Sequence, residues 1–219
     1  MERSLRLTED GSFTLYVDKL DEPYHSIHGA LQESMHVFIK QGLQRVSKSP
    51  LRILEIGFGT GLNALLTLRF AKQSNQEIHY HAVEKYPLTR EEYPQLNFEE
   101  LMEGVPKGSL NRMHEAPWGK TVSLAEYFSV FKEQADFRSM QPFGTFDLVY
   151  FDAFSPDKQP ELWSESVFST IEKCTQKGSV LVTYSSKGVV RRTLISCGFR
   201  VEKVAGPPGK REMIRAVRI

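Results

Sequence analysis

The stretch LRILEIGFGTGLN, residues 51–63, decides the fold of this chain. Its first half is an apolar run that predicts a buried strand, and its glycines predict a tight turn in front of a helix. Glycine lets a ligand approach the backbone closely, and the helix N-terminus behind such a turn offers unpaired N–H groups. The stretch is therefore typical of a loop that binds a nucleotide-like ligand.

The spacing of the glycines favours one class of ligand. A dinucleotide fingerprint, G-x-G-x-x-G, needs glycine at position 62, where this chain has leucine. The observed pattern is acidic-x-G-x-G-x-G, and it resembles the loop for S-adenosylmethionine more than the loop for NAD. The acid fits a site that attracts the cationic amino-acid portion of S-adenosylmethionine. The residues of this pattern are Glu55, Gly57, Gly59, Thr60 and Gly61.

Two polar residues extend this predicted cofactor site. Asn63 lies on the first helical turn after the loop and adds a polar contact. The second strand ends at Glu84, a position where a carboxylate accepts both ribose hydroxyls in enzymes that bind NAD or S-adenosylmethionine. A simple strand–helix turn with a solvated acid is the alternative interpretation, and the combination of loop and acid favours binding.

After residue 50, strand-like and helix-like segments alternate, which predicts a parallel sheet covered on both faces. The last two strands are joined by the turn-rich GPPGKR and predict an antiparallel hairpin at the sheet edge. We therefore expect an α/β fold with a doubly wound, mostly parallel, seven-stranded sheet, the Rossmann-like layout of class I S-adenosylmethionine methyltransferases. The expected strands are 51–57, 78–84, 118–124, 146–154, 178–186, 199–206 and 212–219, and the expected helices are 62–73, 161–174 and 189–198, with a helix-capable stretch from Thr89.

The first fifty residues follow a different pattern. Asp10-Gly11 between 5–7 and 13–17 predicts a hairpin, and apolar residues at helical spacing predict a helix from about His28 to about Val46. We expect residues 1–50 to form an extension that covers the active site of a methyltransferase domain at 51–219.

The composition fits a soluble, cytoplasmic enzyme. The 219 residues are 40% hydrophobic and 25% charged, with a formal net charge of +1. The two cysteines predict free buried thiols in a reducing compartment. No histidine or cysteine spacing suits a metal site, no apolar stretch is long enough to span a bilayer, and the N-terminus lacks the apolar core of a secretory signal.

The strand at 146–154 brings Asp152 to the carboxyl edge of the sheet, where open α/β folds bind their ligands. A carboxylate beside a methyl donor suits an amine acceptor, because it stabilises the nitrogen that becomes cationic and can receive its proton. It also favours the unreactive ammonium, so the acceptor must lose a proton before or during attack. Capping of the next turn is the alternative role for Asp152.

The remaining candidate residues point to a nucleic-acid substrate. Phe154 is a candidate pocket wall on which a flipped base stacks. Residues 187–219 contain nine bases and two acids, a local charge of +7 that is typical of a phosphate footprint. Solvated surface is the alternative interpretation of these bases. The basic residues that we predict to contact substrate are Lys187, Lys210 and Arg211.

GFGTGLN, DAFSPDKQPELW and GKREM together resemble the methyltransferase component of the MnmC family, which makes 5-methylaminomethyl-2-thiouridine at the wobble position of tRNA. The matching segments run from about Tyr24 to near the C-terminus. The resemblance implies methyl transfer from S-adenosylmethionine to the primary amine of 5-aminomethyl-uridine 34, with the tRNA anticodon stem-loop as partner. It implies Asp152 as the catalytic aspartate beside the cofactor, Glu84 as the ribose-binding acid, and Glu33 as part of an N-terminal cover near the cofactor.

Two features depart from that family. The bifunctional members carry a flavin-dependent oxidoreductase domain, and this chain ends before any such domain, so it resembles the stand-alone form. An acid near adenine is often found just after the third strand, but residues 127–133 have Ser129 and Val130 at that place, with Glu133 further along. Three alternatives remain: a methyltransferase for small-molecule amines, an RNA-binding protein without chemistry, and a nicotinamide dehydrogenase, which Leu62 disfavours.

Overall fold

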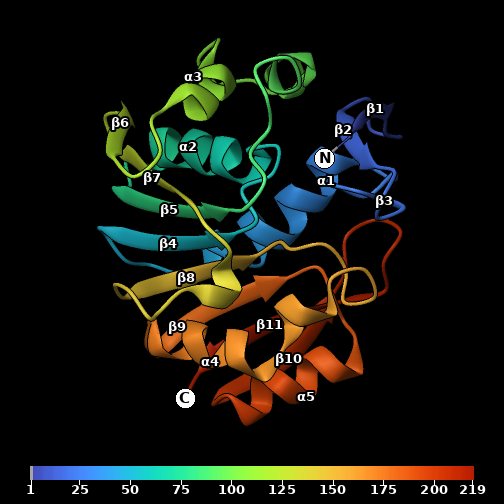
Figure 1. Cartoon of the computed structure of the whole chain (residues 1–219). Helices are drawn as coiled ribbons and strands as arrows, with labels where there is room; N and C mark the ends of the chain where they lie inside the picture. Colours follow the sequence, from blue (N-terminus) through green and yellow to red (C-terminus); the bar gives the residue numbers. More distant parts are fainter. Residues whose placement is uncertain (1) are drawn as a thin grey trace.

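A central eight-stranded sheet organises the chain, whose residues 2–219 are described by a computed structural model (Figure 1). Its five middle strands are parallel to one another, and the strand that flanks them on each side runs antiparallel to its neighbour. In spatial order the strands are β10 (Phe199–Ala205), β11 (Glu212–Arg218), β9 (Thr175–Thr183), β8 (Phe146–Phe151), β4 (Leu51–Ile56), β5 (Ile78–Glu84), β7 (Phe128–Gln134) and β6 (Thr121–Ala125).

The order of these strands reverses at β4, which pairs in parallel with β5 on one side and with β8 on the other. Chain connections leave β4 and β8 in opposite directions along the sheet, so a crevice opens at their carboxyl ends. The alternating pattern correctly predicts this doubly wound, mostly parallel architecture.

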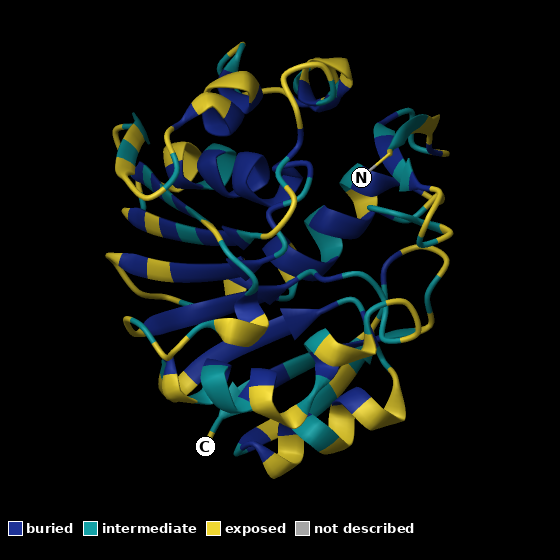
Figure 2. Ribbon diagram, in the orientation of Figure 1, coloured by how far each residue is buried: buried dark blue, intermediate teal, exposed yellow. Residues whose placement is uncertain are grey.

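Helices cover both faces of the sheet. Successive residues of a strand point to opposite faces, and in β4 Ile53 packs into one apolar core while Leu54 packs into the other. The inner strands β4 and β8 are buried along most of their length, whereas the edge strands β6 and β10 are more exposed (Figure 2). The first core is covered by α1 (Ala30–Ser34), α2 (Leu62–Ser74) and α3 (Ser109–Glu115), and the second by α4 (Glu165–Lys173) and α5 (Gly188–Ser196).

The N-terminal segment forms a small antiparallel sheet of β1 (Ser4–Leu7), β2 (Phe13–Val17) and β3 (Glu22–Pro23). The predicted hairpin is therefore present. The predicted helix at 28–46 is shorter and less regular, because the α-helical part ends at Ser34 and a π-helical turn follows to Lys40. The chain then turns at Gly42, where a Cβ atom would lie 2.5 Å from the Phe38 carbonyl oxygen, so only glycine fits there.

The third parallel strand differs from the prediction. Residues 118–124 were expected to supply it, but that region contributes β6, an edge strand antiparallel to β7. The sheet therefore has eight strands rather than seven. Lys132 hides β7 in the sequence because it occupies a buried position on the strand face that it shares with Phe128 and Val130. Its ammonium donates to the His114 carbonyl at 2.7 Å and lies 4.4 Å from the Trp118 ring centroid.

The remaining short helices and the C-terminal hairpin complete the fold. The β10–β11 hairpin is antiparallel as predicted, and Cys174 and Cys197 are buried and free. Within residues 2–219 no helix is long and apolar enough to cross a membrane, and no three potential metal ligands cluster together. The 3₁₀ turns are Leu43–Arg45, Tyr93–Gln95, Phe98–Leu101, Phe137–Ser139 and Pro160–Trp163.

Candidate active site

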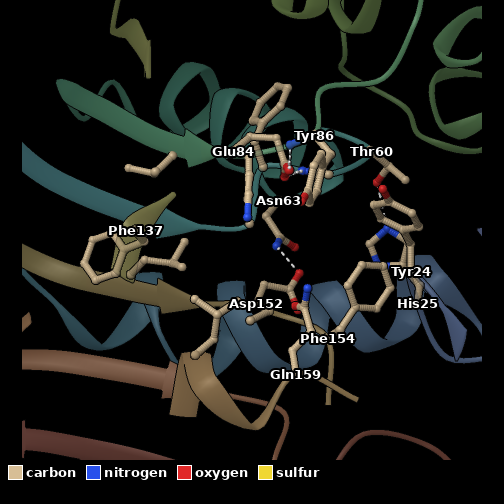
Figure 3. Close-up of a pocket in the computed structure, with 18 of the residues that line it drawn as sticks. Tyr24, His25, Thr60, Asn63, Glu84, Tyr86, Phe137, Asp152, Phe154 and Gln159 are labelled. Carbon is tan, nitrogen blue, oxygen red and sulfur yellow. Dashed lines mark hydrogen bonds between the residues drawn. The ribbon is translucent and has the colours of Figure 1, made fainter. Parts of the chain in front are cut away.

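A cavity of about 260 Å³ opens at the carboxyl ends of the parallel strands, where the strand order reverses (Figure 3). Each parallel strand contributes the residues that directly follow it. They are Gly57–Thr60 after β4, Glu84–Tyr86 at the end of β5, Ala135–Arg138 after β7, Asp152–Phe154 after β8 and Tyr184 after β9. The strand ends thus converge on one cavity, as the switch-point argument predicts.

Two segments far away in sequence close this cavity. Residues 22–26 and Glu33 reach it from the N-terminal segment, and Lys210 reaches it from the loop between β10 and β11. Figure 1 shows this loop, in red, beside the blue N-terminal strands. The sequence predicted Glu33 and Lys210 near a ligand, and the structure brings both into the lining.

The turn after β4 approaches the turn after β8 closely. Gly57 has a φ of +92°, and a Cβ atom there would lie 2.4 Å from the Asp152 carbonyl oxygen. The Gly57 N–H donates to Val83 O at 2.9 Å, and the Asp152 N–H donates to Ile56 O at 3.0 Å. Only glycine therefore allows the two loops to meet. The backbone of residues 57–60 lines the cavity beside Asp152, and we call this turn the glycine cradle.

The Glu84 carboxylate holds the other side of the glycine loop. It accepts the backbone N–H of Gly59 at 3.0 Å and that of Tyr86 at 2.7 Å. Glu84 and Asp152 lie on opposite sides of Asn63 in Figure 3. An acid at the end of β5 thus faces the cavity at the position where the sequence predicted it.

Asn63 links the two other acids of the site. Its amide nitrogen donates to Glu55 Oε1 at 3.0 Å and to Asp152 Oδ2 at 2.8 Å (Figure 3). Glu55 is fully buried beneath the cavity and is not part of its lining. Burial raises the pKa of Glu55 well above its usual range, with the nearby Asp152 charge acting in the same direction. Glu55 is therefore connected to the cavity only through its hydrogen bond with Asn63.

Asp152 is half-buried and faces the cavity. Burial, and next the charge of Glu33, raise the pKa of Asp152 to about 7, against the opposing effects of Asn63 and Lys210. A carboxyl group with this pKa exchanges protons near neutral pH, which suits a general base.

Two uncharged histidines hold Thr60 of the glycine loop. His25 Nε2 lies 2.7 Å from Thr60 Oγ1, and His114 Nε2 donates to the Thr60 carbonyl at 3.0 Å. Burial lowers the pKa of each imidazole to about 4. No pattern in the sequence indicated that His114, which comes from α3, supports Thr60.

The acid expected after the third strand is Asp136, which the sequence analysis missed because it misplaced that strand. Asp136 follows the end of β7 by two residues and lines the cavity. Hydrogen bonds from Arg138 hold the pKa of this carboxyl below its usual range, and Lys85 Nζ donates to it at 3.0 Å. The alternation of Phe128 and Val130 was the available signal.

The chain is similar to known methyltransferases along most of its length. Residues 122–219 match the model of a family described as S-adenosyl-L-methionine-dependent methyltransferase. The chain is 33% identical to the tRNA 5-methylaminomethyl-2-thiouridine biosynthesis bifunctional protein MnmC of Cupriavidus metallidurans, over 94% of this chain and 32% of that protein. The structure of MNMC2 from Aquifex aeolicus matches with a TM-score of 0.78 and 29% identity, over 99% of this chain and 70% of that one. Over nearly its whole length, this chain is similar to MnmC-type S-adenosylmethionine-dependent methyltransferases.

Further matches agree with this family. The MnmC bifunctional protein of Aeromonas hydrophila is 33% identical over 97% of this chain and 35% of that protein. Spermidine synthase from Thermotoga maritima shares the fold alone, with a TM-score of 0.60 at 11% identity, over 99% of this chain and 68% of that one. The chain spans about a third of the length of the curated relatives it matches.

The other predicted site residues are divided between the cavity and the surface. Phe154 lines the cavity, with its ring packed edge-to-face on Tyr24 at 5.0 Å. Gly61 lies just outside the lining and begins α2 with a φ of +76°. Lys187 and Arg211 also lie outside the lining, and Lys187 pairs with an aspartate on the surface.

Ion pairs neutralise much of the basic C-terminal region. Lys and Arg side chains there bind acids both within the region and outside it, so the local charge of +7 overstates the field that a partner meets. Among residues 187–219, Arg191, Arg192 and Arg211 are exposed and have no ion-pair partner. The pairs are Lys187–Asp157, Arg200–Glu202, Lys203–Glu212, Lys210–Glu33, Arg215–Glu202 and Arg218–Glu172.

Proposed function

We propose that this chain transfers a methyl group from S-adenosylmethionine to the primary amine of 5-aminomethyl-uridine, or its 2-thio form, at wobble position 34 of tRNA. The observation that best supports this proposal is the half-buried Asp152 carboxylate, which faces the same cavity as the glycine loop and has a pKa of about 7. The name of the MnmC relatives, which concerns 5-methylaminomethyl-2-thiouridine in tRNA, supports this acceptor.

The cofactor fits the cavity that the glycine cradle lines. Asn63 Oδ1 is buried beside it without a hydrogen-bond partner, and so offers an acceptor to a bound group. When bound, S-adenosylmethionine supplies an electrophilic methyl group carried by a sulfonium. We assign its binding to Glu33, Glu55 acting through Asn63, Gly57, Gly59, Thr60, Gly61, Asn63, Glu84, Asp152 and the newly found Asp136.

Asp152 acts on the acceptor in this proposal. A primary amine enters largely as ammonium near neutral pH, and its nitrogen then has no free lone pair. The Asp152 carboxylate, with its pKa of about 7, accepts a proton from this ammonium and leaves a neutral amine beside the cofactor cradle. Once protonated, Asp152 no longer holds the amine by charge, and it regains its charge by releasing the proton to water.

The tRNA would bind around the mouth of this cavity. Phe154 and Tyr24 form an aromatic wall against which a base extruded from the anticodon stem-loop can pack. Lys187 and Arg211 lie outside the lining, where they can contact the phosphate backbone. We further propose that residues 1–50 act as a cover on the methyltransferase domain at 51–219, since residues 22–26 and Glu33 line the cavity.

The proposal is tested by incubating the purified chain with S-adenosylmethionine and tRNA that carries 5-aminomethyl-uridine 34. Mass spectrometry of the hydrolysed nucleosides should show that this uridine gains one CH₂ unit. The same tRNA with unmodified uridine 34 is the control and should not change. No methylation of the aminomethyl tRNA would contradict the proposal, and equally efficient methylation of the free nucleoside would favour the small-molecule alternative.

A further inference from the structure

One cation faces the end of the cavity that contains Asp152. We call this end the acceptor side and define it by Asp152, Tyr184, Glu33 and Lys210. The Lys210 ammonium lies 2.5 Å from Glu33 Oε1 and 4.2 Å from the centroid of the Tyr184 ring. The Tyr184 hydroxyl donates to Ala153 O at 2.9 Å, next to Asp152. Lys210 is thus held within the same small group of side chains as Asp152.

The loop that bears Lys210 is docked onto the N-terminal segment. A Cβ atom on Gly209 would lie 2.3 Å from the His28 ring, so the two segments are in close contact. Glu33 is fixed from its other side, because Glu33 Oε2 accepts the Ser26 N–H at 2.8 Å. Lys210 therefore differs from a mobile surface lysine, since both its loop and its partner are anchored.

Carboxylates outnumber cations at the acceptor side. Asp152, Glu33 and Glu22 line it, and Glu22 accepts the N–H and hydroxyl of Ser155 at 2.9 and 2.8 Å. Burial keeps the neighbouring His25 and Tyr184 uncharged near neutral pH, because it lowers the pKa of His25 to about 4 and raises that of Tyr184. The other charged lining groups follow β5, β7 and β8: Glu84, Lys85, Asp136, Arg138 and Glu161.

We propose that Lys210 sets the protonation state of the acceptor amine by offsetting the charge of Glu33, and this inference rests on the proposed function above. Each carboxylate near a bound amine stabilises its ammonium form and so raises the amine pKa. With Lys210 in place, the pair Glu33–Lys210 is neutral, and Asp152 and Glu22 are the carboxylates at this side without a paired cation. Without Lys210, Glu33 would add a further uncompensated negative charge that holds the proton on nitrogen.

The step that Lys210 promotes is a balanced proton transfer. An N–H bond of the acceptor ammonium breaks, an O–H bond forms on Asp152, and the electron pair of the broken bond stays on nitrogen as the lone pair. Neither Lys210 nor Glu33 gains or loses a proton in this step. Lys210 is therefore a positioning residue that acts through charge, and its effect must appear in the pH dependence of kcat, which reports groups in the bound complex.

A double-mutant cycle tests the inference, with single-turnover methylation of the aminomethyl tRNA measured from pH 6 to 10. Lys210→Met should move the acid limb of the rate profile up by about one pH unit, a roughly tenfold loss below that limb. Glu33→Gln should move the limb down. In the double variant the acid limb should return to its wild-type pH, whatever the absolute rate, because both charges of the pair are gone. Lys210→Arg should preserve the wild-type profile, and Lys177→Met, on the exposed start of β9, is the matched control.

A purely structural role predicts a different pattern. If the Glu33–Lys210 pair only docks the loop, both single variants should lose activity at every pH and the double variant should recover nothing. Unmoved pH profiles in the single variants would also overturn the inference. If the wild-type chain methylates no aminomethyl acceptor, the proposed function itself fails, and this outcome is distinguished by the wild-type arm alone.

Discussion

The two sides of the cavity are built in different ways. The donor side, which we define by the glycine loop at 57–61 with Glu84 and Asp136, is made by turns that directly follow β4, β5 and β7. The acceptor side joins Asp152 to Glu33 and Lys210, which are 177 residues apart in the chain and meet in an ion pair. Backbone geometry thus forms the cofactor cradle, whereas side-chain contacts between residues distant in the sequence set the charge on the acceptor.

The largest effect should come from the acceptor side. Asp152→Asn removes the group that takes the proton from the acceptor ammonium but keeps a similar shape, so methyl transfer should fall about 10³-fold. Cofactor affinity should change by less than about threefold, because the glycine cradle is intact. Methylation rates and calorimetric titration with S-adenosylmethionine measure the two quantities, and Asp18→Asn, on the exposed surface, is the control. Wild-type rates in Asp152→Asn would remove Asp152 from the mechanism.

A second substitution tests the donor side through its backbone. Gly57→Ala places a Cβ atom 2.4 Å from the Asp152 carbonyl at a φ of +92°, so it should lower the free energy of unfolding by about 3 kcal/mol and abolish cofactor binding. Gly178→Ala is the matched control, because Gly178 has a φ of +89° and open space around it, and should cost about 1 kcal/mol. Urea denaturation of both variants gives the comparison. Equal losses would show that the close approach to Asp152 carries no energetic weight.

The neutral histidines of the donor side should make the fold sensitive to acid. His114 has a pKa of about 4 in the folded chain and about 6.5 when unfolded, so between these values the unfolded state binds more protons. Stability should therefore fall as the pH drops from about 6.5 to 4, with up to about 1.4 kcal/mol per pH unit from this group. His114→Gln retains a donor for Thr60 and should reduce that slope, as measured by urea denaturation across this pH range. An unchanged slope would contradict the assigned pKa.

The smallest effect should come from the outer rim of the acceptor side. Arg211 is exposed and unpaired within residues 187–219, so Arg211→Ala should weaken tRNA binding by about threefold. The slope of log affinity against log salt should fall by about one, and kcat should not change. Filter binding across a salt series measures both quantities. An unaltered salt slope would place the tRNA elsewhere on the surface.

The difference between the two sides also explains what the sequence could predict. Residues 51–63 encode strand, turn and helix in contiguous positions, so the fold and the cradle could be inferred from local pattern. Asp152 could be predicted as a site residue because it comes at the end of a long apolar strand. The pairing of Glu33 with Lys210 and the support of Thr60 by His114 depend on tertiary contacts, which leave no periodic trace in the sequence.

In β7, a single buried charged residue made the strand unrecognisable from its apolar pattern. Lys132 occupies a core position of β7, where its ammonium is satisfied by the His114 carbonyl and by the Trp118 ring. The resulting break in the apolar alternation moved the predicted third strand to residues 118–124. Asp136, two residues beyond the true strand, was missed as a consequence.

The proposed mechanism requires that the glycine loop and Asp152 line one cavity, and that this cavity binds the methyl donor and the amine acceptor at the same time. A crystal structure of the chain with S-adenosylhomocysteine tests this most directly. We predict that the sulfur atom lies between the turn at Gly57 and the Asp152 carboxylate, with the ribose hydroxyls on Glu84. A ligand bound elsewhere, or an Asp152 side chain directed away from the sulfur, would contradict the account.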